Sequence, residues 1–290
     1  MIFAHHFESS QDAWRHWELN PLILVSLLVL AVGFYLGTRR MATAARTRGR
    51  FRWRAAAFYA GVVVLGLALV SPIDAVSSAL FSVHMVQHLI LMLVVAPLIA
   101  YAHPWPVLFI ALPRAARSAM RRTARLPLLR RAAVVGGAAA TIVAVNIAGL
   151  WIWHLPDPYQ AALANDFLHG LEHATFLGIA YPLWALAFDA ARRERFGSAI
   201  AAFFITAMQS AALGAVLFLS NYPLYEMHIE PAYRWGLQPL HDQQLAGALM
   251  WVPPGIAYLM TMIGLVWRWM ARYEKTHPAA VTASGRGEQA

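Results

Sequence analysis

The sequence has no cysteine among its 290 residues, and only 13% of its residues are charged. Without cysteine the chain forms no disulfide and offers no thiolate to a metal, so a soft metal would have to move between imidazole and thioether ligands. The low charge also leaves too little polar surface for a soluble globular protein, because 60% of the residues are hydrophobic. These shortages indicate a polytopic membrane protein.

Acidic residues are scarce as well: 14 Asp and Glu stand against 23 Lys and Arg, which gives a formal net charge of +9. In a soluble protein this balance would favour a nucleic-acid partner. The chain shows no nucleic-acid-binding module and no repeat of aromatic and basic residues, so no nucleic-acid partner is expected. The basic residues instead orient the helices in the lipid bilayer, which is the expected surrounding of this chain.

Apolar runs of about 20 residues, the length that crosses a bilayer, recur along the chain. They predict an all-α fold, a bundle of seven transmembrane helices at approximately 19–38, 55–72, 79–101, 132–153, 164–188, 197–220 and 244–267. The first run has no basic leader and no cleavage pattern, so it is expected to remain as an anchor. The prolines of "WVPPG" (251–255) are expected to break the last helix.

Three parts of the chain are expected to differ in placement. Residues 1–18 form an extracytoplasmic tail, residues 19–270 form the seven-helix membrane domain, and residues 271–290 form a disordered cytoplasmic tail. The basic residues give the orientation: 21 of the 23 lie in the C-terminal tail and in the segments after the first, third and fifth predicted helices. By the positive-inside rule, the N-terminus is outside and the C-terminus is cytoplasmic in the cell (inner) membrane.

Two pairs of histidines stand near the outer surface on this topology. His84 and His88 lie in "HMVQH", and His169 and His173 lie in "HGLEH". Residues at i and i+4 share one helix face about 5–6 Å apart, and both helices run inward from the outside. If the two helices face each other, the four imidazoles converge on a transition metal. The alternative is that they are hydrogen-bonding residues between helices.

Other residues near the same surface are weaker candidates. His154 and His241 are included as metal ligands, although either could cap a helix or lie in the aromatic belt. Four carboxylates could accept the remaining imidazole proton of a ligating histidine, and these are Asp74, Asp166, Glu172 and Asp242. Asp166 and Asp242 could instead be helix N-caps, which is the favoured role for Asp242. Four histidines are expected to be solvated: His5, His6, His16 and His228.

Several segments carry a resemblance to a known family. They are "SPID" (71–74), "HMVQHLILMLVVAPL" (84–98), "WHLPDPYQAAL" (153–163), "LHGLEHATFLGIAYPLW" (168–184), "NYPLYE" (221–226) and "DQQLAGALMWVPPG" (242–255). In this order, they resemble the signature blocks of the CtaG-like family of multi-pass cytochrome c oxidase assembly factors. One departure is Pro254, which stands where the family form has glycine.

The resemblance implies an assembly factor and not an enzyme. It further implies binding or delivery of copper, with cytochrome c oxidase subunits and other copper chaperones as partners. Two other interpretations remain open. In a haem-binding or electron-transfer protein, one histidine from each pair would ligate iron. In a membrane metalloenzyme, the pairs would hold one or two metals, although the sequence shows no nucleophile motif beside them.

Overall fold

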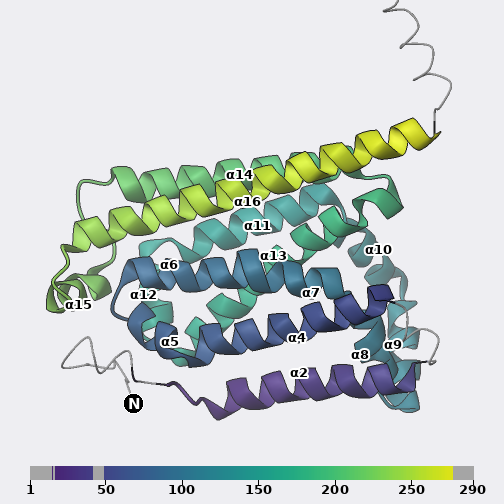
Figure 1. The fold of residues 1–290 in the computed structure, drawn as a ribbon. Coiled ribbons are helices and arrows are strands. Elements are labelled where there is room, and N and C mark those ends of the chain that lie inside the picture. Colours follow the sequence, from purple (N-terminus) through teal and green to yellow (C-terminus); the bar gives the residue numbers. More distant parts are fainter. Residues whose placement is uncertain (1–14, 16, 42–48, 277–290) are drawn as a thin grey trace, which may run out of the picture.

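A computed structural model describes residues 15, 17–41 and 49–276, and every regular element within these ranges is helical (Figure 1). The all-α prediction is therefore confirmed. Most of the predicted N-terminal tail, including His5, His6 and His16, lies outside the described residues, as does the chain after residue 276. The last helix reaches Thr276, beyond the predicted end of the membrane domain at residue 270.

The long helices run roughly alongside one another, with short helices at both ends of the bundle (Figure 1). The long ones are α2 (Pro21–Arg40), α4 (Gly49–Val70), the continuous α6 (Phe81–Ile90), η1 (Leu91–Val95) and α7 (Ala96–Ala102), then α11 (Ala139–Trp153), α13 (Asp166–Arg193), α14 (Phe196–Leu219) and α16 (Pro239–Thr276). At one end lie α5 (Pro72–Ser77), α12 (Pro156–Leu163) and α15 (Ile229–Arg234), the last preceded by η2 (Glu226–His228). At the other end lie α8 (Pro104–Ala111), α9 (Arg114–Ala124) and α10 (Pro127–Gly136).

The seven predicted ranges all fall on helices, but fewer qualify as membrane spans by length and composition. Five qualify: α2, α4, the continuous helix over 81–102, α14 and α16. A sixth would be α11 together with α12, which are bent by 72° at their junction. α13 is 28 residues long but is not among these candidate spans. Within the described residues the count is therefore five or six, which does not confirm the seven predicted.

The helix α16 continues through Pro253 and Pro254, so the predicted break is wrong. Pro254 has no N–H for the carbonyl of Met250 one turn earlier. The hydroxyl of Ser210 on α14 donates to that carbonyl at 2.7 Å. Because a neighbouring helix satisfies the freed carbonyl, the helix can keep its path in an apolar environment.

A second irregularity lies in the helix that carries the first histidine pair. In the π-helical turn η1, the N–H of Ala96 donates to the carbonyl of Leu91, five residues earlier. On this pattern the carbonyl of Met92 would face Pro97, which has no N–H to give. The indole N–H of Trp184 on α13 donates to Met92 instead, at 2.8 Å. This bond ties together the two helices that carry the histidine pairs.

The helices α14 and α16 approach closely at Gly214 and Gly247. A Cβ atom on either glycine would lie 2.6 Å from the carbonyl oxygen of the other, so no larger residue fits without moving a backbone. This contact fixes α16 against the bundle. The first turn of α16 can then reach the start of α6.

Candidate metal centre

His84 and His88 lie on α6, whose first turn is capped by another helix. Leu80 precedes α6 and gives no side-chain cap. The carboxylate of Asp242 on α16 accepts hydrogen bonds from the backbone N–H of Phe81 at 2.7 Å and of Ser82 at 3.2 Å. A carboxylate satisfies the free N–H groups at a helix N-terminus and complements the helix dipole. Asp242 is thus a capping residue, as favoured from the sequence, but it caps α6 and not its own helix.

His169 and His173 lie on the first turns of α13. The side chain of Asn165 caps this helix, because its oxygen accepts from the N–H of Phe167 at 3.0 Å and of Leu168 at 3.1 Å. Asp166, the other N-cap candidate, follows the cap and is exposed. The cap sets the start of α13 at Asp166, three residues before His169, so the pair lies in the first turns of α13, and this end of α13 lies beside α5 and α12 (Figure 1).

The two histidine pairs face each other. The ring centroids of His84 and His169 are 5.4 Å apart with the rings nearly parallel, and those of His88 and His173 are 5.3 Å apart. Within each pair the centroids are 4.3 Å apart. His84, His88 and His173 are buried and His169 is partly buried. The two helices therefore pack with the pairs at matched depth, as the sequence suggested.

Glu172 lies close to the first pair, His84 and His88, and is fully buried. Its Oε2 is 3.7 Å from Nε2 of His84, and its Oε1 is 3.8 Å from Nε2 of His88. These distances are too long for hydrogen bonds. One potential ligand atom from each of the three residues lies within 4.8 Å of the others. The arrangement leaves an interval between the three side chains that one metal ion could bridge.

Several buried polar atoms of the two pairs and of Glu172 have no hydrogen-bond partner within the described part of the chain. They are Nε2 of His84, His88, His169 and His173 and both carboxylate oxygens of Glu172. A buried polar atom without a partner costs about 1–3 kcal/mol. Histidines retained for hydrogen bonds between helices would make such bonds, so this geometry disfavours that interpretation. Imidazole nitrogen and carboxylate oxygen are both suitable metal ligands, and the group fits a bound ion.

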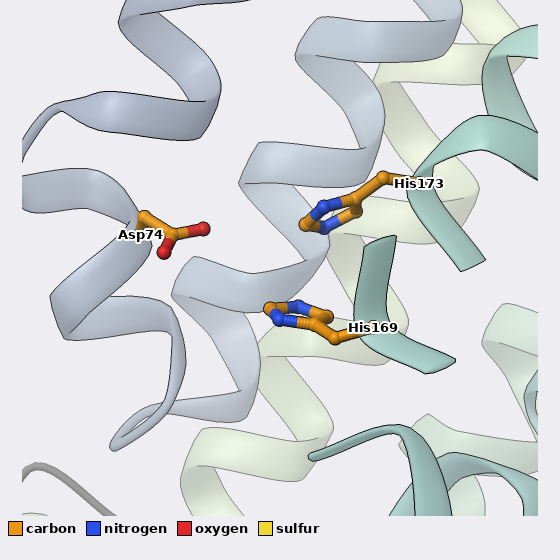
Figure 2. A group of neighbouring side chains, drawn as sticks. All are labelled: Asp74, His169 and His173. Atoms are coloured by element: carbon orange, nitrogen blue, oxygen red, sulfur yellow. The ribbon is translucent and has the colours of Figure 1, made fainter. Parts of the chain in front are cut away.

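Asp74 approaches the second pair from α5. Figure 2 shows its carboxylate directed toward the rings of His169 and His173, and potential ligand atoms of the three residues lie within 4.8 Å of one another. The side-chain amide of Gln87 donates to Oδ1 of Asp74 at 2.6 Å and to the carbonyl of Ala68 at 2.8 Å. Gln87 lies between His84 and His88 on α6 and so holds Asp74 in place. Asp74 can ligate an ion or accept an imidazole proton.

His228 lies at the edge of the group, although the sequence predicted it to be solvated. It is 4% exposed, and its ring centroid is 6.5 Å from that of His84. Its Nδ1 faces the carbonyl of Ala79 at 3.2 Å, so Nδ1 carries the proton and Nε2 accepts from the hydroxyl of Tyr159 at 2.7 Å. Burial lowers the pKa of His228 to about 4. No local signal marked it, because Tyr159 and Ala79 are distant in sequence.

His154 ends α11 and is also buried, with its ring centroid 6.5 Å from that of His88. It therefore borders the group on the side away from His228. His241, in contrast, is exposed on the first turn of α16 and belongs to neither of the two candidate ligand groups. Of the predicted ligands, the structure brings five near one another and leaves His241 outside.

Comparison with known proteins gives a family but no individual relative. No curated protein and no solved structure matches the chain. The model of one family, described as cytochrome c oxidase caa3 assembly factor (Caa3_CtaG), matches residues 32–272. This range contains the two histidine pairs, the capping residue Asp242 and both proline-containing segments of α16 and α7. The chain therefore belongs to the family of cytochrome c oxidase caa3 assembly factors.

Proposed function

We propose that this assembly factor binds copper at its histidine centre and hands it to a cytochrome c oxidase subunit during assembly. The observation that carries the proposal is that His84 and His88 lie close to Glu172 while His169 and His173 lie close to Asp74, with buried histidine nitrogens and Glu172 oxygens that lack other partners in the described residues. Other copper chaperones are the proposed source of the metal. The role is one of binding and transfer, without catalysis.

The ligand chemistry favours copper over the commoner hard cations. Calcium and magnesium prefer oxygen ligands, whereas this centre offers mainly imidazole nitrogen. Among divalent first-row metals, nitrogen and oxygen sites bind Cu(II) most tightly. Release would proceed by exchange of imidazole ligands, aided by their protonation, since the chain has no cysteine.

A haem group fits this centre poorly. The facing rings are only 5.3–5.4 Å apart between the two pairs, and the cavity that adjoins His88 and His154 has a volume of about 20 Å³. Pockets for cofactors and small molecules measure about 300–1,000 Å³. The same small volume leaves no space for an organic substrate beside the metal, which disfavours a metalloenzyme.

We further propose that the centre faces outward from a cell membrane that the chain crosses seven times, with α13 and the bent α11–α12 pair as the additional spans. The histidine pairs lie in the first turns of α6 and α13, and α5, α12 and α15 lie at that end of the bundle (Figure 1). The basic helix α9, which carries Arg114, Arg117, Arg121 and Arg122, lies at the opposite end. By the positive-inside rule the α9 end is cytoplasmic.

Reporter fusions test this orientation. A reporter joined after Arg122 should be active only as a cytoplasmic enzyme, and one joined after Pro158 only as an extracytoplasmic enzyme, because the basic residues determine which loops are retained inside. Each position receives two reporters, one active only in the cytoplasm and one active only outside it. The signal of one reporter then controls for the expression of the other. A cytoplasmic signal at Pro158 would place the histidine centre on the wrong side for the proposed role.

Metal titration of the purified wild-type protein tests the copper proposal directly. We expect about one equivalent of Cu(II) to bind at the centre, with nitrogen hyperfine structure from several imidazoles in the electron paramagnetic resonance spectrum. Zn(II) should bind more weakly, following the order of divalent affinities. A protein that binds no Cu(II), or binds it without imidazole nitrogen, would refute this use of the histidines.

A further inference from the structure

A second pair of possible ligands lies beside the histidine centre. The Nδ1 atom of His154 is 2.7 Å from the carbonyl oxygen of Leu150, which can only accept a hydrogen bond. Nδ1 therefore carries the proton, and Nε2 of the neutral ring keeps its lone pair. That Nε2 faces the sulfur atom of Met85 at 3.5 Å. A thioether has no proton to donate, so two lone-pair donors point at each other.

We infer that Met85 and His154 form a separate soft site that binds copper as Cu(I). The inference rests on the proposed function in taking copper as the cargo, and it adds an oxidation state and a sulfur ligand. Thioether sulfur is a soft ligand that selects Cu(I) over the harder divalent ions. For metal bonds of about 2.0 Å to nitrogen and 2.3 Å to sulfur, a separation of 3.5 Å is suitable for two neighbouring ligands of one ion.

The surroundings of this pair suit a small cation without bound water. Met85 is 1% exposed and His154 is 7% exposed. Both line the cavity of about 20 Å³ whose other walls include His88, Met92 and Phe176. A volume of about 10–15 Å³ already accommodates one water-sized particle, so the cavity has room for one ion and little else. Its mostly apolar walls favour a singly charged ion over a doubly charged one.

His88 connects the soft site to the histidine centre. It lines the cavity beside Met85 and His154, and both of its ring nitrogens lack a partner among the described residues. Its ring centroid is 6.5 Å from that of His154 and 4.3 Å from that of His84. His88 can therefore complete the coordination of Cu(I) as a third ligand. An ion held there would lie one ligand exchange away from the histidine centre.

The test compares two conservative methionine substitutions. In Met85→Leu the thioether is lost with little change in volume. In the control, Met262→Leu, a partly buried methionine of α16 that does not line the cavity is changed in the same way. Cu(I) affinity is measured on the purified full-length protein under anaerobic, reducing conditions by competition with a chromophoric Cu(I) chelator. We expect Met85→Leu to weaken Cu(I) binding by at least about 10-fold and Met262→Leu to leave it within about twofold.

X-ray absorption identifies the ligand itself. The Cu(I)-loaded wild-type protein should show one copper–sulfur distance, which disappears in Met85→Leu and persists in Met262→Leu. Equal Cu(I) affinity of the two variants and the wild-type protein, or a Cu(I) spectrum without sulfur, would overturn the inference.

One further variant separates this inference from the proposed function. His169→Ala removes a ligand of the histidine centre and leaves the Met85–His154 pair intact, so it should lose Cu(II) but keep the copper–sulfur signal with Cu(I). If the wild-type protein binds no Cu(II) while its Cu(I) binding depends on Met85, the proposed histidine centre fails and the soft site stands. If Cu(II) binds through imidazoles but Cu(I) shows no sulfur ligand, the soft site fails and the histidine centre stands.

Discussion

Replacing His84 by alanine should remove most of the Cu(II) bound to the purified protein, and adding His169→Ala should cause little further loss. The rings of these residues face each other at 5.4 Å on two helices. Residues that hold one ion act as a unit, so the second substitution has little left to remove. We expect each single change to lower Cu(II) affinity by more than the roughly 10- to 100-fold that loss of an outer carboxylate such as Asp74 costs. Competition titration and metal analysis of each variant give the values.

The matched control is His241→Ala. His241 is a histidine near the same end of the bundle, but it is exposed and belongs to neither candidate ligand group, so its replacement should leave Cu(II) affinity unchanged. A different outcome for the His84 and His169 variants would restore the interpretation that the histidines hydrogen-bond between helices. If His84→Ala and His169→Ala keep their metal but lower the thermal stability, the four histidines serve helix packing, and any metal centre lies elsewhere, around His154 and His228.

A strain without this protein should assemble little active cytochrome c oxidase, although the oxidase transcripts remain at their normal level. The reason is that an oxidase subunit without its copper cannot complete its metal centre. A plasmid with the wild-type gene should restore activity, a His88→Ala gene should not, and a His241→Ala gene should. Copper added to the medium should restore part of the activity. Oxidase activity and the copper content of isolated oxidase are the measurements.

The copper content of the isolated oxidase shows whether the protein supplies copper or acts as a scaffold. If the oxidase isolated from the deletion strain contains normal copper but is present in a reduced amount, the protein acts as a scaffold and does not supply copper. Immunoblots must show that the His88→Ala protein reaches the same level as the wild-type protein. His88 is buried and packs against Phe176, so its loss could also affect folding.

Some features of the centre followed from short stretches of sequence alone. The spacing of His84 and His88, and of His169 and His173, placed each pair on one face, because helix geometry relates residues four apart regardless of the rest of the chain. Apolar runs separated by basic loops predicted the helices, which the structure contains. Together these features predicted that the pairs lie at matched depth, and the centroid distances agree with that prediction.

Other features depend on how each helix is rotated and on what packs against it. Glu172 is adjacent to His173, and only the packing of α13 against α6 brings its carboxylate close to His84 and His88. His228 looked like a loop residue, but the Tyr159 hydroxyl and the Ala79 carbonyl enclose it. Asp242 looked like a cap for its own helix, but it caps α6 because the close contact of Gly214 and Gly247 fixes α16 against the bundle.

The sequence by itself determined the class of the protein, its helices and the two histidine pairs, since composition and i,i+4 spacing act locally. Only the tertiary structure decided that α16 stays unbroken at Pro254, because the rescuing hydroxyl of Ser210 comes from another helix. It likewise decided that Met85 faces His154, a contact across 69 residues of sequence. Hydrogen bonds and ligand contacts between distant segments depend on packing angles and depths, which no local pattern specifies.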